Sequence, residues 1–256
     1  MHDDSSSAVS VPEWFSIAHA QLARPRDWTR EEAVPWSMPI VLHIPKNADD
    51  KPSRNALLVA AATAVVATCL AEPAGHVDST LYKGLDGWYG ERIRKIARRA
   101  RNAQWTRVQE IPGATATVNG AAARALVPTP VSDTPQQVSK LQIGGTDLPY
   151  DDPSDIVSAS DTAPTLWVDR GLDMTVGKAA AQVGHASMLY AAALSAEQAW
   201  EWAQSGYSMN IREVPRSEWP VTASNGDSNE SIVAVRDAGY TEIAPGSVTV
   251  VVTVRS

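Results

Sequence analysis

Residues 165–194 read TLWVDRGLDMTVGKAAAQVGHASMLYAAAL, and this stretch predicts a strand, a short loop and a long helix. Residues 165–169 are apolar in the manner of a strand, and residues 170–174 form the loop. Thr175 is a suitable N-cap for a helix over residues 176–194, because its hydroxyl can accept a hydrogen bond from a backbone N–H. The helix is rich in alanine, so it can lie close to a sheet. We therefore expect an α/β unit here.

Three long polar side chains interrupt the alanines of this helix. Lys178, Gln182 and His185 are spaced i, i+4 and i+7, so they share one face. The helix dipole disfavours a cation in the first turn, yet a lysine beside the N–H groups there makes a positive site for an anion or oxyanion. Taken singly, each residue has a plainer interpretation, as a surface lysine or as a polar group satisfied in the core.

A second informative segment lies near the end of the chain, where residues 237–249 read DAGYTEIAPGSVT. An acid and a glycine leave a strand, and a proline–glycine pair turns the chain into the last strand. Asp237, Thr241 and Thr249 are short side chains that hold their position well. The plainer alternative is a hairpin loop in which these residues cap backbone N–H groups.

The elements around these two segments complete one α/β unit, and a similar unit precedes it in the chain. In the second unit we expect a helix over 195–206 with a capping box of Ser195 and Gln198, then strands over 207–214, 231–236 and 247–255. Elsewhere we expect a loosely attached polar arm (1–34), a first α/β domain (35–130), a Pro- and Asp-rich linker (131–161) and the second domain (162–256).

The first domain is predicted to follow the same order of strand, long helix, second helix and three strands. We expect a strand over 39–44, a helix from Ser53 to about residue 70, a helix over 88–103, and strands over 106–111, 114–118 and 124–127. Asn119-Gly120 indicates a hairpin turn. This order suggests an internal duplication, and coincidence between two ordinary α/β units is the alternative.

Basic residues gather in the predicted second helix of the first domain. Residues 91–107 hold seven of the 22 basic residues of a chain whose net charge is −7. Such a cluster favours an anion-binding patch, while a solvated helix face is the alternative. The residues that we assign to RNA binding are Arg94, Lys95, Arg98, Arg99 and Arg101.

Composition restricts the class of protein. With 256 residues, 44% of them hydrophobic, the chain can bury a core. A lone cysteine, Cys69, excludes a disulfide framework. Residues 1–10 lack the features of a secretory signal, and the apolar run 56–70 is shorter than the ~20 residues of a membrane span. We expect a cytoplasmic protein with no membrane partner.

The motifs GKAAAQVGHA (177–186) and DAGYTEIAPGSVT (237–249) together resemble the class II peptidyl-tRNA hydrolase family. The resemblance covers residues 165–256. It implies an α/β/α sandwich around a four-stranded mixed sheet, and hydrolysis of the ester that joins a peptide to tRNA. It implies no metal or organic cofactor. The implied catalytic residues are Lys178, Gln182, His185, Asp237, Thr241 and Thr249.

The sequence also departs from this family. Asp169, Gly171 and Glu242 stand where the family often has other residues, so basic groups are lost and acids are gained. The first domain lacks the site: if Arg54 is placed on Lys178, Leu58 and Ala61 fall on Gln182 and His185. Enzymes of this family commonly form dimers, so a degenerate copy would give either an intrachain pseudo-dimer in a monomer or a homodimer.

Two functions of different classes are therefore open. The first is an ester hydrolase that acts on peptidyl-tRNA or on an N-blocked aminoacyl-tRNA with water as the nucleophile. The second is a binding module on the same fold that grips tRNA or another partner and has lost turnover. The acids near the motifs and the net charge of −7 favour the second function, whereas the first is favoured by the retained residues Lys178, Asp237, Thr241 and Thr249.

Overall fold

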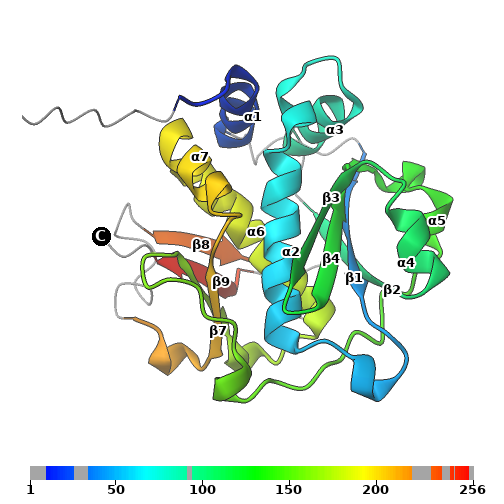
Figure 1. Cartoon of the computed structure of the whole chain (residues 1–256), viewed down its shortest axis with the longest axis vertical. Coiled ribbons are helices and arrows are strands. Elements are labelled where there is room, and N and C mark those ends of the chain that lie inside the picture. Colours follow the sequence, from blue (N-terminus) through cyan, green and yellow to red (C-terminus); the bar gives the residue numbers. More distant parts are fainter. Residues whose placement is uncertain are drawn as a thin grey trace, which may run out of the picture.

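Two mixed sheets with helices packed against them form the protein (Figure 1). The computed structural model describes residues 10–25, 34–90, 94–220, 232–237, 243–244 and 246–253. The first sheet has the order β2-β1-β4-β3, with a short β5 on β1, and the second has the order β7-β6-β9-β8. The strands are β1 (Trp36–His43), β2 (Lys95–Ala100), β3 (Gly113–Val118), β4 (Ala121–Leu126), β5 (Thr129–Pro130), β6 (Thr165–Asp169), β7 (Asn210–Val214), β8 (Ile232–Arg236) and β9 (Val248–Thr253).

Seven α-helices are described, and two of them form the centre of the molecule. The helices are α1 (Glu13–Ala23), α2 (Arg54–Cys69), α3 (Thr80–Tyr89), α4 (Ala103–Val108), α5 (Gln136–Ser139), α6 (Val176–Ala193) and α7 (Ala196–Gln204). Short 3-10 turns are η1 (Ala48–Asp50), η2 (Glu72–Gly75), η3 (Val131–Asp133), η4 (Pro153–Asp155), η5 (Arg170–Leu172) and η6 (Arg216–Glu218). The two long helices, α2 and α6, pack on each other between the sheets (Figure 1). One hydrophobic core therefore extends through both units.

Helix α2 is buried on nearly all sides, as its apolar composition requires. Ser53 caps it, since the Ser53 hydroxyl accepts a hydrogen bond from the N–H of Ala56. The segment Arg54–Gly75 is apolar enough, and at 22 residues long enough, to cross a membrane. Length alone therefore does not distinguish it from a spanning segment, but 72% of its most apolar window is buried inside the protein, which is the setting of a core helix.

The two sheets have the same topology, whereas the sequence predicts only a similar order of elements in the two units. In each, the first strand pairs in parallel with the second and antiparallel with the fourth, and the third pairs antiparallel with the fourth. The second helices also share a detail: the indole N–H of Trp88 donates to Arg94 O (3.1 Å) and that of Trp202 donates to Ser208 O (2.8 Å). Each indole thus holds the loop that enters the second strand of its unit.

The contact between α2 and α6 follows an approximate two-fold axis. When the N-caps Ser53 and Thr175 are aligned, Ala62 matches Gly184 and Val65 matches Ser187. Ser187 Oγ donates to Ala62 O (2.9 Å), and the matching pair also touches, since a Cβ on Gly184 would lie 2.8 Å from Val65 Cγ2. A repeated contact between the same two positions is the signature of an isologous interface.

Residues 13–23 correct the expectation of a loosely attached arm over residues 1–34. They form α1, in which Phe15, Ala18 and Leu22 are buried against α6 and η2. His19 Nε2 lies 2.9 Å from Ala191 O on α6. Apolar residues are spread around this short helix without a clear stripe, which makes the local signal weak, and the helix is buried because both η2 of the first unit and α6 of the second pack against it.

Residues 95–100 correct the prediction of a basic helix over 88–103. Helix α3 ends at Tyr89, residues 91–93 lie outside the described part, and residues 95–100 form the edge strand β2. The spacing of Ile96, Ala97 and Ala100 fits a helix, but parallel pairing with β1 outweighs that local preference. Charged side chains suit an edge strand, since they discourage further strand pairing.

The segment predicted as a strand over 106–111 is also different, because residues 103–108 form α4. This helix and α5 cover the far face of the first sheet, where Val108 and Val138 are buried. The Asn119-Gly120 hairpin is confirmed, with positive φ angles of 47° and 80°. The far face of the second sheet carries Trp219, which packs on Val251.

The linker is tied to both units. Asp151 accepts hydrogen bonds from the N–H groups of Arg54 and Asn55 at the start of α2. The N–H of Val157 donates to Asn55 Oδ1, and the N–H of Ala159 donates to Asn210 Oδ1 in the second unit. Each unit thus meets the other through α2 and α6 and through this strap of chain.

Candidate active site

Lys178 lies in the first turn of α6, where the sequence predicts it. Strand β6 ends at Asp169, η5 turns the chain, and Thr175 then caps α6 by accepting a hydrogen bond from the N–H of Lys178 (3.2 Å). The Lys178 side chain is 12% exposed, so its ammonium group is largely withdrawn from water. A cation in this position adds to the positive end of the helix dipole.

Asp237 follows β8, immediately after a break in strand register. The pairing of β8 with β9 shifts between Val235 and Arg236, which is a β-bulge. The N–H of Asp237 then donates to Ser247 O (2.8 Å), and the N–H of Gly246 donates to Asp237 O (2.7 Å). Bulges commonly redirect a side chain at a functional site, and here the carboxylate is 4% exposed.

Four of the predicted residues form one hydrogen-bonded network. The ammonium of Lys178 pairs with Asp237 Oδ2, and Gln182 Nε2 donates to the same oxygen at 2.6 Å. Thr249 Oγ1 donates to Gln182 Oε1 at 2.9 Å, which orients the amide so that its NH₂ group faces the carboxylate. Gln182 and Thr249 are buried. The low dielectric of such a site strengthens each charge interaction within it.

The structure shows less of the other two predicted catalytic residues, His185 and Thr241. His185 is half-buried on α6, three residues beyond Gln182. Thr241 lies outside the described residues. Asp169, whose acidic character departs from the family pattern, is buried; its Oδ1 accepts a hydrogen bond from the N–H of Gly171 (2.9 Å), and its Oδ2 lies 3.9 Å from Arg216 Nε.

The five residues assigned to RNA binding lie on β2 or beside it. Arg98 Nη1 donates to Ser139 O and Leu141 O, and burial lowers the pKa of its guanidinium. Arg99 Nε donates to Gln142 Oε1. The side chain of Lys95 lies near Met188 Sδ and over the Trp88 ring. Three of these five side chains therefore contact protein groups, and they do so from a strand and not from the predicted helix.

The first unit has none of the network at the matching positions. Aligning the N-caps matches Lys178 with Ala56 and Gln182 with Ala60, which corrects the expectation that Arg54 matches Lys178. When Ile40 is aligned with Leu166, their antiparallel partners Ala125 and Val252 also match, which places Ala122 at the position of Thr249. The loop between β8 and β9, which carries Asp237, is reduced to the two-residue turn between β3 and β4.

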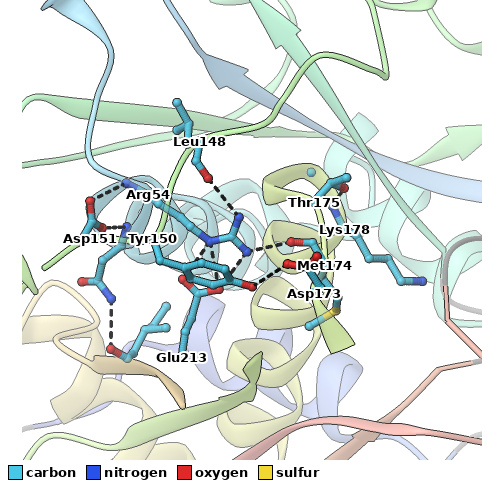
Figure 2. A network of polar contacts seen from close by, with 12 residues as sticks. Arg54, Leu148, Tyr150, Asp151, Asp173, Met174, Thr175, Lys178 and Glu213 are labelled. Atoms are coloured by element: carbon cyan, nitrogen blue, oxygen red, sulfur yellow. Dashed lines mark hydrogen bonds and ion pairs between the residues drawn. The ribbon is translucent and has the colours of Figure 1, made fainter. Parts of the chain in front are cut away.

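A second polar cluster, which the sequence analysis missed, joins the two units beside the start of α6 (Figure 2). Its centre is Arg54, whose side chain is 4% exposed and pairs with Glu213 on β7. Arg54 also donates to the carbonyl of Met174, and the ring of Tyr150 covers its guanidinium. A charged residue at the start of an apolar helix was the only signal, since its partner is far away in the sequence.

Residues 164–254 match the family model described as peptidyl-tRNA hydrolase PTH2. The second unit carries the PTH2 sequence pattern. The PTH2 segment covers about a third of the chain and contains all four residues of the network. Comparisons with curated proteins and with solved structures found no match. Within the described residues, no three His, Cys, Asp or Glu side chains gather as a metal ion would require.

Proposed function

We propose that this protein hydrolyses the ester bond between tRNA and a peptide or an N-blocked aminoacyl group, with water as the nucleophile. One observation carries the proposal: Lys178 and Gln182 from α6 both contact the carboxylate of Asp237, which follows β8, although the two segments are far apart in sequence. These residues belong to the PTH2 segment, whose family is defined by peptidyl-tRNA hydrolysis.

Each member of the network has a role in this proposal. Asp237 orients the attacking water and accepts its proton. Lys178 stabilises the negative charge that develops on the carbonyl oxygen, as a preorganised donor does in other acyl-transfer sites. Gln182 and Thr249 hold the carboxylate in place. His185 and Thr241 are proposed to position the acceptor end of the tRNA and the water, respectively.

The partners and architecture belong to the same proposal. We propose a cytoplasmic protein with tRNA as its partner, in which residues 35–130 are a degenerate copy of residues 162–256 and replace a second subunit. The shared strand order and the two-fold contact of α2 with α6 support this interpretation. Among the basic residues near β2, Arg101 is proposed to meet RNA phosphates, since Arg98 and Arg99 donate to protein groups.

The second candidate is a tRNA- or partner-binding module without turnover. The net charge of −7 and the direct pairing of Lys178 with Asp237 favour it, because both groups are already engaged with each other. Release of an N-acetylated amino acid from its tRNA separates the two functions. The hydrolase releases product catalytically, whereas the binding module retains the intact N-acetylaminoacyl-tRNA in a filter-binding assay.

A further inference from the structure

The turn that leads to Lys178 is held by residues outside the PTH2 segment. Arg54 Nη2 donates to Met174 O at 2.8 Å, and that carbonyl belongs to the peptide group joining Met174 to the N-cap Thr175. Figure 2 shows Arg54 on one side of this turn and the side chain of Lys178 extending away on the other. Arg54, a residue of the first unit, thus fixes the backbone that leads to Lys178, the proposed oxyanion donor.

Arg54 is itself tightly fixed. Its Nε lies 3.0 and 2.9 Å from the two carboxylate oxygens of Glu213, and its Nη2 lies 2.8 Å from Glu213 Oε1. Glu213 is on β7, so Nε and Nη2 of Arg54 bind the second sheet, and Nη2 also binds the turn before α6. Arginine suits this position because its planar group makes several directed hydrogen bonds at once.

The linker adds a second hold on the same turn. The N–H of Gly177 donates to Thr146 Oγ1 at 3.2 Å, and Thr146 is 2% exposed. A Cβ at position 177 would lie 3.0 Å from that oxygen, so glycine allows the linker to approach closely. One of the N–H groups that a helix start leaves without an intrahelical partner is therefore satisfied from outside the PTH2 segment.

The backbone at this turn needs such support. Asp173 has φ 44° and ψ 46°, a left-handed conformation that few residues other than glycine adopt, although aspartate does so more readily than most. Tyr150 OH lies 3.4 Å from Asp173 Oδ1, and the Tyr150 ring lies between the guanidiniums of Arg54 (4.5 Å) and Arg170 (4.3 Å). A strained backbone of this kind persists only where its surroundings fix it.

We propose that Arg54 is a positioning residue for Lys178, so that the first unit completes the site of the second. The inference rests on the proposed function, because Lys178 acts there as the oxyanion donor. Without Arg54, the turn over residues 173–177 relaxes and the ammonium of Lys178 moves from its place. A displacement of about 1 Å in such a group can lower turnover about 100-fold.

The experiment compares two buried arginines of the first unit. Arg54→Met removes the tether to Met174, whereas Arg124→Met removes a buried guanidinium that donates to Ile111 O and Thr115 Oγ1 on the far side of the first sheet. With N-acetylaminoacyl-tRNA as substrate, Arg54→Met should lower kcat by about 10- to 100-fold and leave KM within about twofold. Arg124→Met should keep kcat, even at an equal loss of melting temperature.

A double variant separates a loss of positioning from a loss of stability. Arg54→Met with Glu213→Met leaves no unpaired buried charge, so it should recover stability but not kcat. Recovery of kcat together with stability overturns the proposal, as does an equal loss of kcat in Arg124→Met.

Amide hydrogen exchange of residues 173–180 is read in parallel, without any substrate. Exchange should be faster in Arg54→Met and in the double variant, and unchanged in Arg124→Met. If the wild-type protein releases no product, the proposed function fails. Unchanged exchange in Arg54→Met then overturns the positioning role as well, and faster exchange supports it.

Discussion

The two units of this protein share a fold but carry different side chains at the positions of the candidate site. Both pack a long helix against four strands of the same order. In both, a tryptophan indole donates a hydrogen bond to the loop before the second strand. Where the second unit has Lys178, Gln182 and Thr249, the first has alanines. Packing positions are therefore retained in both units, whereas the polar site is present in one.

The comparison also shows what the first unit contributes instead. Its α2 is apolar nearly all round and fills the space between the sheets, so a polar stripe like that of α6 would be buried there without partners. At its start, Arg54 reaches across to the second unit. The unit without the network thus supports the unit that has it.

The largest effect is expected from Asp237→Asn. An amide cannot accept a proton from water, so kcat should fall by about 10²- to 10⁴-fold while the affinity for tRNA changes little. Single-turnover hydrolysis and filter binding measure the two quantities. A large loss of affinity with unchanged turnover at saturation would make Asp237 a substrate-positioning group.

Lys178→Ala should lower kcat by about 10²- to 10³-fold, because it removes a preorganised oxyanion donor. The matched control is Ala56→Gly at the corresponding position of the first unit. That change should cost about 1 kcal/mol of stability through helix propensity and leave kcat unchanged. Near-normal turnover of Lys178→Ala would show that the lysine has no part in the chemistry.

The contact between the units should determine stability as a whole. Gly184→Leu crowds Val65 across the α2–α6 contact and should lower the free energy of unfolding by about 1–3 kcal/mol in a single transition. The control is Gly144→Leu, where a Cβ meets nothing within 4 Å. Calorimetry should show one transition, and a fragment of residues 162–256 should be poorly soluble or dimeric. Two separate transitions, or a stable and active monomeric fragment, would mean that the units are independent.

The smallest effects are expected from substitutions of the basic residues in the first unit. Arg101→Gln should reduce the salt dependence of tRNA binding by about one unit of slope, since it removes one phosphate contact. Arg98→Gln should instead reduce stability by about 1 kcal/mol, because the carbonyl groups of Ser139 and Leu141 lose their donor at a partly exposed place, where water can replace it. Unchanged salt dependence for Arg101→Gln would leave RNA binding to the second unit.

Local signals in the sequence were sufficient for much of the fold. Ser53 and Thr175 cap the two central helices, Ser195 and Gln198 form the capping box of α7, and Gly206 has a positive φ of 70° after that helix. Each of these acts over a few residues, so it can be recognised without knowledge of the tertiary structure. The order of elements in the second unit followed from the same local patterns, whereas in the first unit the segments 88–103 and 106–111 were assigned wrongly.

The candidate site was also largely contained in the sequence, because its residues lie in two short motifs. The spacing of Lys178 and Gln182 placed them on one face of a helix, and the structure brings Asp237 and Thr249 to that face. The contact itself could not be derived from spacing, since it depends on β9 lying beside β6 and on the bulge after Val235.

Tertiary structure alone decided the features whose partners are distant. Strand β2 forms because β1 offers it a parallel edge, against a local pattern that favours a helix. Helix α1 is buried because η2 and α6 both pack against it. Arg54 binds Glu213, 159 residues away, and so supports the turn before Lys178. Caps and periodicity depend on neighbouring residues, whereas strand partners and buried ion pairs depend on which distant segments the packed core brings together.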